Sequence, residues 1–146
     1  PDIASYRGAM GAEDFWWLRA LEVEHALLTN NPLAGMGLDF AKCFDSLPWE
    51  VLFGMAEHAG LPAPILQALR GMCAQLQRRF RVGPVVGLPF ASTNGIIQGC
   101  PASVLLLNLF VATWAAAMKK FVPGSKPKAY ADDASATAPT PKDVLE

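Results

Sequence analysis

Residues 128–137 read Lys-Ala-Tyr-Ala-Asp-Asp-Ala-Ser-Ala-Thr, a short stretch with two adjacent aspartates at its centre. Aspartate is favoured in turns and the flanking residues suit short strands, so this stretch predicts a tight β-hairpin with Asp132 and Asp133 at its tip. Two adjacent carboxylates in an apolar setting repel one another unless a cation is present. Taken alone, the pair is also typical of an ordinary surface turn.

A third aspartate lies much earlier in the chain, at the end of a short apolar stretch. Residues 36–40 are expected to form a strand in which Leu38 and Phe40 face one side and Asp39 the other. Carboxylates at strand ends or turns combine a rigid backbone with side chains that reach solvent. Taken alone, Asp39 is typical of an ordinary residue at the end of a strand. Whether it has a functional role depends on the other motifs in the sequence.

Apolar periodicity and terminating residues predict the remaining elements. Helices are expected at residues 13–29, 48–58, 63–76 and 101–120, two strands of a second hairpin at 78–82 and 85–91, and the start of another helix at Lys142. The order of helices, strands and hairpins predicts an α+β fold, in which a small antiparallel sheet is packed on helices.

Composition narrows the class of protein. The chain has 146 residues, 52% hydrophobic and 17% charged, which suits a globular domain with its own core. Its net charge is −1, whereas an enzyme that binds a nucleic-acid duplex is usually basic.

The longest apolar run, residues 104–118, is interrupted by Asn108 and is shorter than the roughly 18 residues of a membrane-spanning helix, so no membrane span is expected.

Three cysteines and two histidines are too few and too dispersed for a zinc site. Cys43, Cys73 and Cys100 form no Cys-x-x-Cys pair and are expected to be small core residues. An odd, sparse set of cysteines suits a reducing intracellular compartment.

Three blocks of sequence together carry a family resemblance. The segment 37–45 reads GLDFAKCFD, the segment 94–103 reads NGIIQGCPAS, and the segment 130–133 reads YADD. In this order they resemble the catalytic blocks of the reverse transcriptases of non-LTR retrotransposons and group II introns. Arg7-Gly8 and the helix that follows are similar to the fingers segment of that family. One departure is Val104, where many relatives have proline.

The resemblance implies a polymerase palm together with part of the fingers. Residues 1–35 would be a fingers-like segment and residues 36–146 the palm core, truncated before the thumb. We therefore expect the chain to be a segment of a longer protein and to be incomplete as a polymerase by itself. The missing parts would hold much of the duplex-binding surface, which accounts for the near-neutral charge. A eukaryotic retroelement as the source would imply a nuclear location.

The resemblance also implies an activity and its metal ligands. The activity would be RNA-directed DNA polymerase, a two-metal nucleotidyl transfer from a dNTP to the 3′-hydroxyl of a DNA primer on an RNA template. Asp39 and Asp132 would be the principal ligands of two Mg²⁺ ions, or of Mn²⁺, and Asp133 a less direct third carboxylate. Aspartate oxygens are the ligands that Mg²⁺ prefers.

Substrate contacts follow from the same resemblance. The ring of Phe44, five positions after Asp39, would lie under the sugar and exclude a 2′-hydroxyl, although an ordinary core aromatic is also a reasonable interpretation. Gln98 and Gly99 would lie along the incoming nucleotide and the template, and Arg7 would contact the template or the triphosphate. Five further positions stay open between nucleic-acid or site roles and surface roles: Lys42 and Asp45, and the basic cluster of Arg78, Arg79 and Arg81.

Two other classes of protein share part of this pattern. A viral-type RNA-directed RNA polymerase also has two aspartates spaced like Asp39 and Asp45, but Phe44 would obstruct a ribose, and Tyr130-Ala131 before the aspartates favours reverse transcriptase. The alternative from another class is a catalytically silent remnant, or a domesticated domain that only binds nucleic acid or protein. Intact carboxylates at all three positions argue against this alternative, and truncation argues for it.

Overall fold

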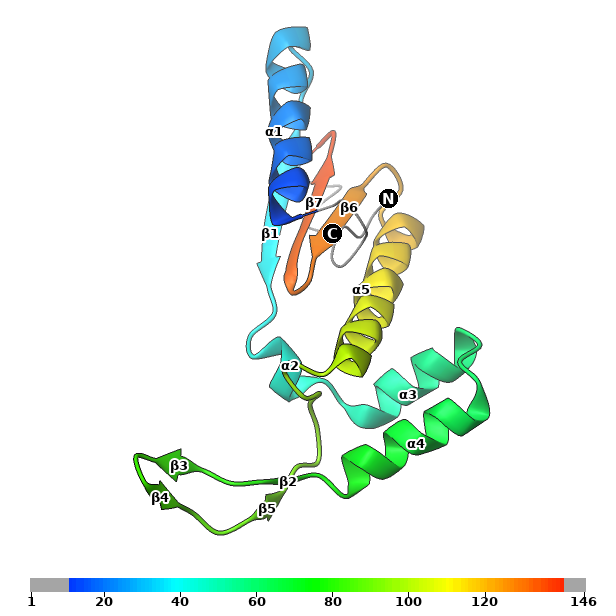
Figure 1. Ribbon diagram of the computed structural model, residues 1–146. Helices are drawn as coiled ribbons and strands as arrows, with labels where there is room; N and C mark the ends of the chain where they lie inside the picture. Colours follow the sequence, from blue (N-terminus) through cyan, green and yellow to red (C-terminus); the bar gives the residue numbers. More distant parts are fainter. Residues whose placement is uncertain (1–10, 141–146) are drawn as a thin grey trace. The chain divides into compact units, whose positions relative to one another are not determined.

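The computed structural model describes residues 11–140. Arg7 and the helix expected at Lys142 lie outside the described residues. The elements are α1 (Ala12–Thr29), β1 (Ala34–Asp39), α2 (Cys43–Ser46), α3 (Trp49–His58), α4 (Ala63–Ala74), β2 (Gln77–Arg78), β3 (Arg81–Val82), β4 (Val85–Val86), β5 (Phe90–Ala91), α5 (Pro101–Phe121), β6 (Lys126–Tyr130) and β7 (Asp133–Ala138), shown in Figure 1. The four expected helices and the α+β class are confirmed, as is the hairpin that carries Asp132 and Asp133. The second hairpin is present, but its two expected strands at 78–82 and 85–91 are each interrupted, the first into β2 and β3 and the second into β4 and β5. The short helix α2 was not expected from the sequence.

The chain forms two compact units, and each is described by itself. The first comprises residues 1–41 and 107–146, and the second comprises residues 42–106. These units are defined by contacts within the fold. The assignment of residues 1–35 to fingers and 36–146 to palm is a functional division, and it stays a prediction.

The centre of the first unit is a three-stranded antiparallel sheet in the order β1-β7-β6. Successive side chains of a strand point to opposite faces, so the register sorts residues into two sets. One face carries small apolar residues that are buried, and the other carries hydroxyls and lysines. The buried apolar set is Pro127, Ala129, Ala134, Ala136 and Ala138. The polar set is Lys126, Lys128, Ser135 and Thr137.

Helix α1 packs against the polar face through Arg19, whose side chain is buried with only 7% of the residue exposed. Its Nε donates to Ser135 Oγ at 2.9 Å, and its Nη1 donates to Thr137 Oγ1 at 2.9 Å and to Glu22 Oε2 at 2.6 Å. Its Nη2 donates to the carbonyl oxygens of Lys126 at 2.7 Å and Ser135 at 2.9 Å. A buried guanidinium is tolerated only when its donors are satisfied in this way, so Arg19 ties α1 to β6 and β7.

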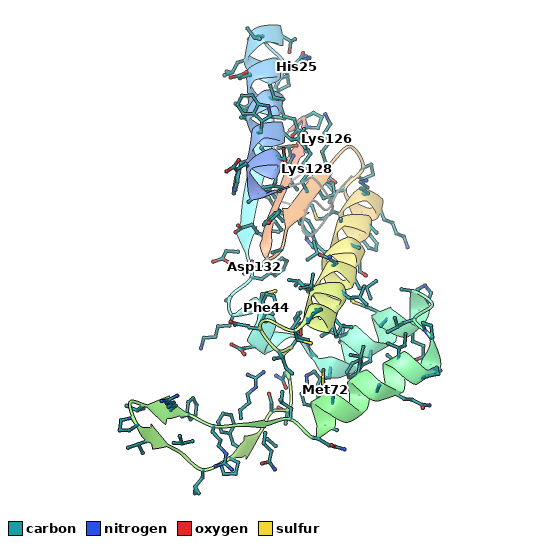
Figure 2. All side chains as sticks on the ribbon, in the orientation of Figure 1. His25, Phe44, Met72, Lys126, Lys128 and Asp132 are labelled. Carbon is teal, nitrogen blue, oxygen red and sulfur yellow. The ribbon has the colours of Figure 1, made fainter. Side chains whose placement is uncertain are left out.

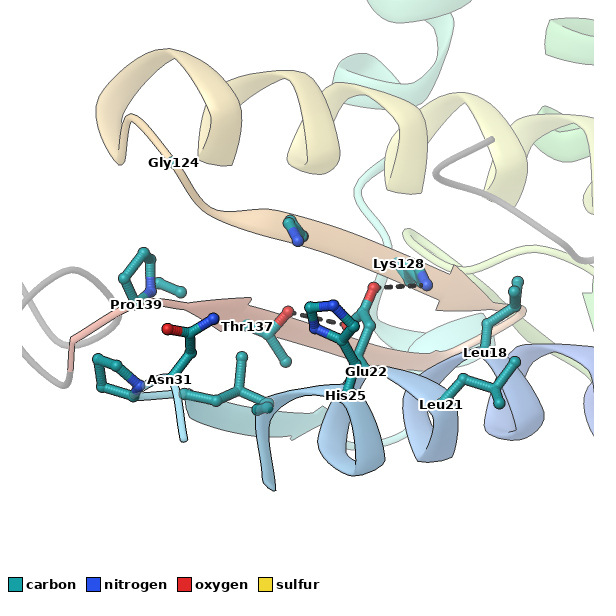
Figure 3. A pocket seen from close by; sticks show the side chains of 14 residues that line it. Leu18, Leu21, Glu22, His25, Asn31, Gly124, Lys128, Thr137 and Pro139 are labelled. Carbon is teal, nitrogen blue, oxygen red and sulfur yellow. Dashed lines mark hydrogen bonds and ion pairs between the residues drawn. The ribbon is translucent and has the colours of Figure 1, made fainter. Parts of the chain in front are cut away.

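Helix α5 lies beside β6, on the other side of the sheet from α1 (Figures 1 and 3). Within the first unit its buried residues Leu107, Val111 and Ala115 recur every four positions, which defines one apolar stripe. Phe110 makes an edge-to-face contact with Phe40, with ring centroids 5.7 Å apart. Among the described residues, α5 is the one helix long and apolar enough to cross a membrane, a criterion that buried helices of globular proteins also meet.

The second unit contains a helix pair and a two-stranded ribbon. Helix α3 packs against α4, and the two helices bury Leu52, Phe53, Ala56, Leu66 and Cys73. The ribbon spans residues 77–91: β2 pairs with β5 near its base, and β3 pairs with β4 next to the turn at Gly83-Pro84. Gly83 has φ 58°, a left-handed conformation that glycine adopts readily.

Candidate active site

Three carboxylates meet at one corner of the sheet in the first unit. Asp39 is the last residue of β1 and Asp133 the first residue of β7, and the register places them directly opposite one another. Directly opposed residues in an antiparallel pair have Cβ atoms about 4.5–5.5 Å apart. Tyr130 pairs with Asp133 across the hairpin, so Ala131 and Asp132 form its two-residue connection. Figure 2 shows Asp132 at the tip of this hairpin.

The carboxylate corner is electrostatically unbalanced. Asp39 and Asp133 are exposed and Asp132 is half-buried. Within residues 11–140, none of the three side chains forms an ion pair or hydrogen bond. Like charges directly opposite on neighbouring strands destabilise a sheet. Ala131 adds strain, because its φ of 53° lies in the left-handed region that disfavours a residue with a Cβ. Such strain is commonly found at functional turns.

The donor set at this corner suits a hard divalent cation. All three side chains offer carboxylate oxygens, and Mg²⁺ binds such oxygens while keeping several of its waters. In the part of the chain that the structure describes, no group of three His, Cys, Asp or Glu side chains is arranged to enclose an ion. The carboxylates therefore match Mg²⁺ in ligand chemistry, while their arrangement in the described residues does not by itself enclose an ion.

In the second unit, hydrogen bonds join the segment around Phe44 to the loop that carries Gln98 and Gly99. Phe44 lies half-buried in α2, and its carbonyl oxygen accepts a 2.6 Å hydrogen bond from the backbone N–H of Ile96. The backbone N–H of Gly95 donates to the carbonyl oxygen of Leu47 at 2.8 Å. Gly99 has φ 87°, which a residue with a side chain rarely adopts. Within the second unit, backbone hydrogen bonds thus hold α2 and the loop that carries Gln98 and Gly99 together.

Asp45, for which the sequence left a site role and a surface role open, forms an ion pair with Arg78. Arg78 Nη1 donates to Asp45 Oδ1 at 2.8 Å, an ion pair whose partners are both partly exposed. Gln98 lines a shallow cavity of about 260 Å³ together with this pair. Exposed ion pairs contribute about 0–1 kcal/mol, so the pair's effect on stability is small. Lys42 has φ 50° and immediately precedes α2.

Gly95 is a residue whose role the sequence analysis missed. A Cβ added there would lie 2.7 Å from the carbonyl oxygen of Asp45, 2.8 Å from its Cα and 2.8 Å from the carbonyl oxygen of Phe44. Its carbonyl oxygen also accepts a 2.5 Å hydrogen bond from Trp49 Nε1. Only the Asn-Gly dipeptide, a common turn signal, hinted at this constraint. The close approach is visible only when both segments are folded.

Gly95→Ala is expected to destabilise the second unit by at least about 2 kcal/mol, because it combines a left-handed φ with a clash against backbone atoms that cannot rotate away. Urea denaturation would measure the loss. Gly99→Ala is the matched control: Gly99 also has a positive φ, but its added Cβ would meet no atom within 4 Å. An equal loss of unfolding free energy in the two variants would show that the loss comes from the left-handed φ alone. The close contact of the added Cβ with the backbone of Phe44 and Asp45 would then contribute nothing.

A separate cavity of about 450 Å³ lies between α1 and the polar face of the sheet (Figure 3). Glu22 is one of its lining residues and accepts hydrogen bonds from Lys128 Nζ at 2.8 Å and Thr137 Oγ1 at 3.1 Å. Burial by itself raises the pKa of Glu22, but the hydrogen bonds and charges of Lys128 and Arg19 outweigh it, so the pKa lies below its ordinary value of 4.5. Glu22 is thus an ionised partner that forms ion pairs with both Arg19 and Lys128, which is a structural role.

Comparisons with known proteins are consistent with this arrangement. Residues 9–146 match the family described as reverse transcriptase (RNA-dependent DNA polymerase). A search of curated proteins gave no significant match. Among solved structures, the chain is similar to telomerase from Candida albicans in complex with a fragment of telomeric RNA, with a TM-score of 0.69 and 12% identity over 97% of this chain and 28% of that one.

Apo telomerase from Candida tropicalis, truncated from its C-terminal domain, is similar as well, with a TM-score of 0.67 and 15% identity over 97% of this chain and 31% of that one. At such identities the likeness shows a shared fold, and the chain spans less than a third of each of these proteins. The family match covers nearly the whole chain. This protein therefore belongs to the reverse transcriptase (RNA-dependent DNA polymerase) family.

Proposed function

We propose that this chain is the catalytic core of an RNA-directed DNA polymerase of the non-LTR retrotransposon or group II intron type. It would transfer a nucleotidyl group from a dNTP to the 3′-hydroxyl of a DNA primer paired with an RNA template. The observation that carries the proposal is the carboxylate corner: Asp39 and Asp133 are register partners, and Asp132 occupies the adjoining turn. Unpaired like charges at that corner are what a cation-binding site requires.

Asp39 and Asp132 would hold the ions and Asp133 would support them. Two bound Mg²⁺ ions, or Mn²⁺, would supply activation of the primer hydroxyl and stabilisation of the departing pyrophosphate. The chain's own contribution is a rigid strand end and a two-residue turn, which hold the carboxylates in place before substrate binds. Pre-organised carboxylates need little rearrangement when charge develops in the transition state.

Phe44, Gln98 and Gly99 would handle the nucleotide and template, with Arg7 as a further contact to template or triphosphate. The hydrogen bond between Ile96 and Phe44 supports a shared role, because it holds the aromatic residue and the loop as one feature. Gly99, which adopts φ 87° and has no side chain, would allow a ligand to approach the backbone closely.

The alternative function, a catalytically silent or domesticated domain that only binds nucleic acid or protein, predicts no extension under any condition. The discriminating assay is Mg²⁺-dependent extension of a DNA primer on an RNA template, with the 146-residue chain and with a longer protein that contains it. We expect extension by the longer protein and little or none by the chain alone, because the chain spans less than a third of the telomerase structures it resembles. Failure of the longer protein would favour the silent alternative.

Phe44→Ala is expected to increase incorporation of rNTP relative to dNTP by about tenfold or more, because removing the ring would make room for the 2′-hydroxyl, and steric discrimination in a packed site is about 1–3 kcal/mol. The ratio of kcat/KM for the two nucleotides is the measurement. Phe44→Tyr keeps the ring and is expected to keep the selectivity. An unchanged ratio in Phe44→Ala, with extension retained, would remove the gate role from this residue.

A further inference from the structure

The two-stranded ribbon of residues 77–91 is the most exposed part of the second unit. All of its residues except Arg78 are exposed, and Figure 1 shows the ribbon projecting away from α3 and α4. An isolated two-stranded ribbon is at best marginally stable in water. A ribbon that leaves its aromatic and aliphatic side chains in solvent is therefore expected to gain stability from a partner.

Positive charge is concentrated on this ribbon. Residues 77–91 contain three arginines and no acidic residue, whereas the rest of the chain holds nine basic and thirteen acidic residues. Arg78 is paired with Asp45. Arg81 makes one hydrogen bond, from its Nε to the carbonyl oxygen of Gly83 at 3.0 Å, and Arg79 has no ion-pair partner among residues 11–140. Two guanidinium groups are thus available to an anionic partner.

An aromatic pair lies beside these arginines. The rings of Phe80 and Phe90 are stacked, with centroids 5.0 Å apart and planes 23° from parallel. Phe80 is 74% exposed and Phe90 is 39% exposed. Phe80 is next to Arg79 and Arg81 in sequence, and because successive side chains of an extended strand point to opposite faces, the two guanidinium groups are expected on the face opposite the exposed ring. Bases of single strands stack on such rings while basic side chains neutralise the phosphates.

We propose that this ribbon binds a single-stranded segment of nucleic acid, with Phe80 as a stacking platform and Arg79 and Arg81 as phosphate contacts. The inference rests on the proposed function, in which a template strand must be held outside the carboxylate corner. Exposed aliphatic residues on the same ribbon, Val82 and Leu88 among them, would also suit a protein partner. The concentrated positive charge and the stacked rings favour nucleic acid, because both its phosphates and its bases are then matched.

Fluorescence anisotropy of the full chain with a labelled single-stranded RNA, without dNTP or Mg²⁺, tests the charge contacts. Each phosphate contact contributes about −0.7 to the slope of log K against log salt for a single strand, so Arg79→Gln/Arg81→Gln is expected to make the slope shallower by about 1.4. Lys119→Gln/Lys120→Gln is the matched control, since it removes two positive charges from the last turn of α5. Equal changes of slope in both variants would overturn the local role of the arginines.

Two substitutions of Phe80 distinguish the stacking of a base on its ring from simple apolar packing. Phe80→Leu is expected to weaken binding about fivefold or more, whereas Phe80→Tyr, which keeps the ring, is expected to bind as the unchanged chain does. Equal weakening by both substitutions would overturn the stacking role. Concentration-dependent self-association that Phe80→Leu abolishes, together with unchanged RNA binding, would assign the ribbon to a protein contact between copies and overturn the proposal.

The outcome for the ribbon is separable from the outcome for the proposed polymerase. If a longer protein extends primers but the ribbon variants bind RNA as before, the inference about the ribbon is wrong while the polymerase function stands. If no extension is found but the ribbon variants lose binding, the inference stands without the polymerase function.

Discussion

Asp132→Asn is expected to reduce Mg²⁺-dependent primer extension by a longer protein containing this chain by about a thousandfold or more. The substitution preserves the size of the side chain and removes the charge that would hold an ion. Metal-ion catalysis supplies several kcal/mol of transition-state stabilisation, and about 4 kcal/mol corresponds to about a thousandfold in rate. Single-turnover extension with saturating dNTP is the measurement, because it reports the chemical step.

The control for this prediction is a measurement of the free energy of unfolding. Asp133 lies directly opposite Asp39, so Asp133→Asn is expected to stabilise the fold by about 0.2–1 kcal/mol in the absence of divalent cations. Urea denaturation with a chelator would detect this gain, and added Mg²⁺ should reduce it. A loss of extension in Asp132→Asn with unchanged stability would assign the effect to the site. Retained extension would instead remove Asp132 from the metal ligands.

Arg19→Met is expected to destabilise the first unit by about 3–5 kcal/mol, the range found when one partner of a buried ion pair is removed. The guanidinium makes five hydrogen bonds, to the side chains of Ser135, Thr137 and Glu22 and to two backbone carbonyl oxygens. Methionine fills the space but removes all five of these hydrogen bonds, while Glu22 keeps those from Lys128 and Thr137. Because whole domains are stable by about 5–15 kcal/mol, circular dichroism during denaturation should show a large shift of the midpoint.

Two comparisons sharpen this prediction. The double variant Arg19→Met/Glu22→Gln isolates the contact between Arg19 and Glu22, because Glu22 keeps its ion pair with Lys128 at 2.8 Å when Arg19 is removed, and the coupling between the two sites should be about 0.5–3 kcal/mol. Arg70→Met is a matched control, since Arg70 is exposed and its contact with Glu57 is a loose 3.8 Å. If Arg19→Met behaves like Arg70→Met, the hydrogen-bond network around Arg19 contributes no stability.

The same network predicts a dependence on pH. The pKa of Glu22 is lower in the folded chain than its ordinary 4.5, so its contribution to stability is fully present above pH 4.5 and is lost as the pH falls through the folded pKa. Arg19→Met removes one of the charges that lower this pKa. The acid-induced loss of stability should therefore be smaller in the variant than in the unchanged chain.

Local features of the sequence predicted most of the elements because each one depends on neighbouring residues. Helical periodicity located α1, α3, α4 and α5, and Gly83-Pro84 located the tip of the ribbon. The helix α2 was missed because four residues are too few to show a period. Arg19 was missed because its position on a mixed helix face gives no sign that hydroxyls of a distant strand will meet it.

The sequence by itself determined the family, the hairpin with Asp132 and Asp133 at its tip, and a strand expected at residues 36–40, which the structure has at Ala34–Asp39. The tertiary structure alone decided that Asp39 pairs with Asp133, because register depends on strands nearly a hundred residues apart in sequence. It alone decided that Gly95 must have no side chain and that Arg19 can be buried. Each of these depends on atoms that only folding brings within contact distance, so no local pattern can encode them.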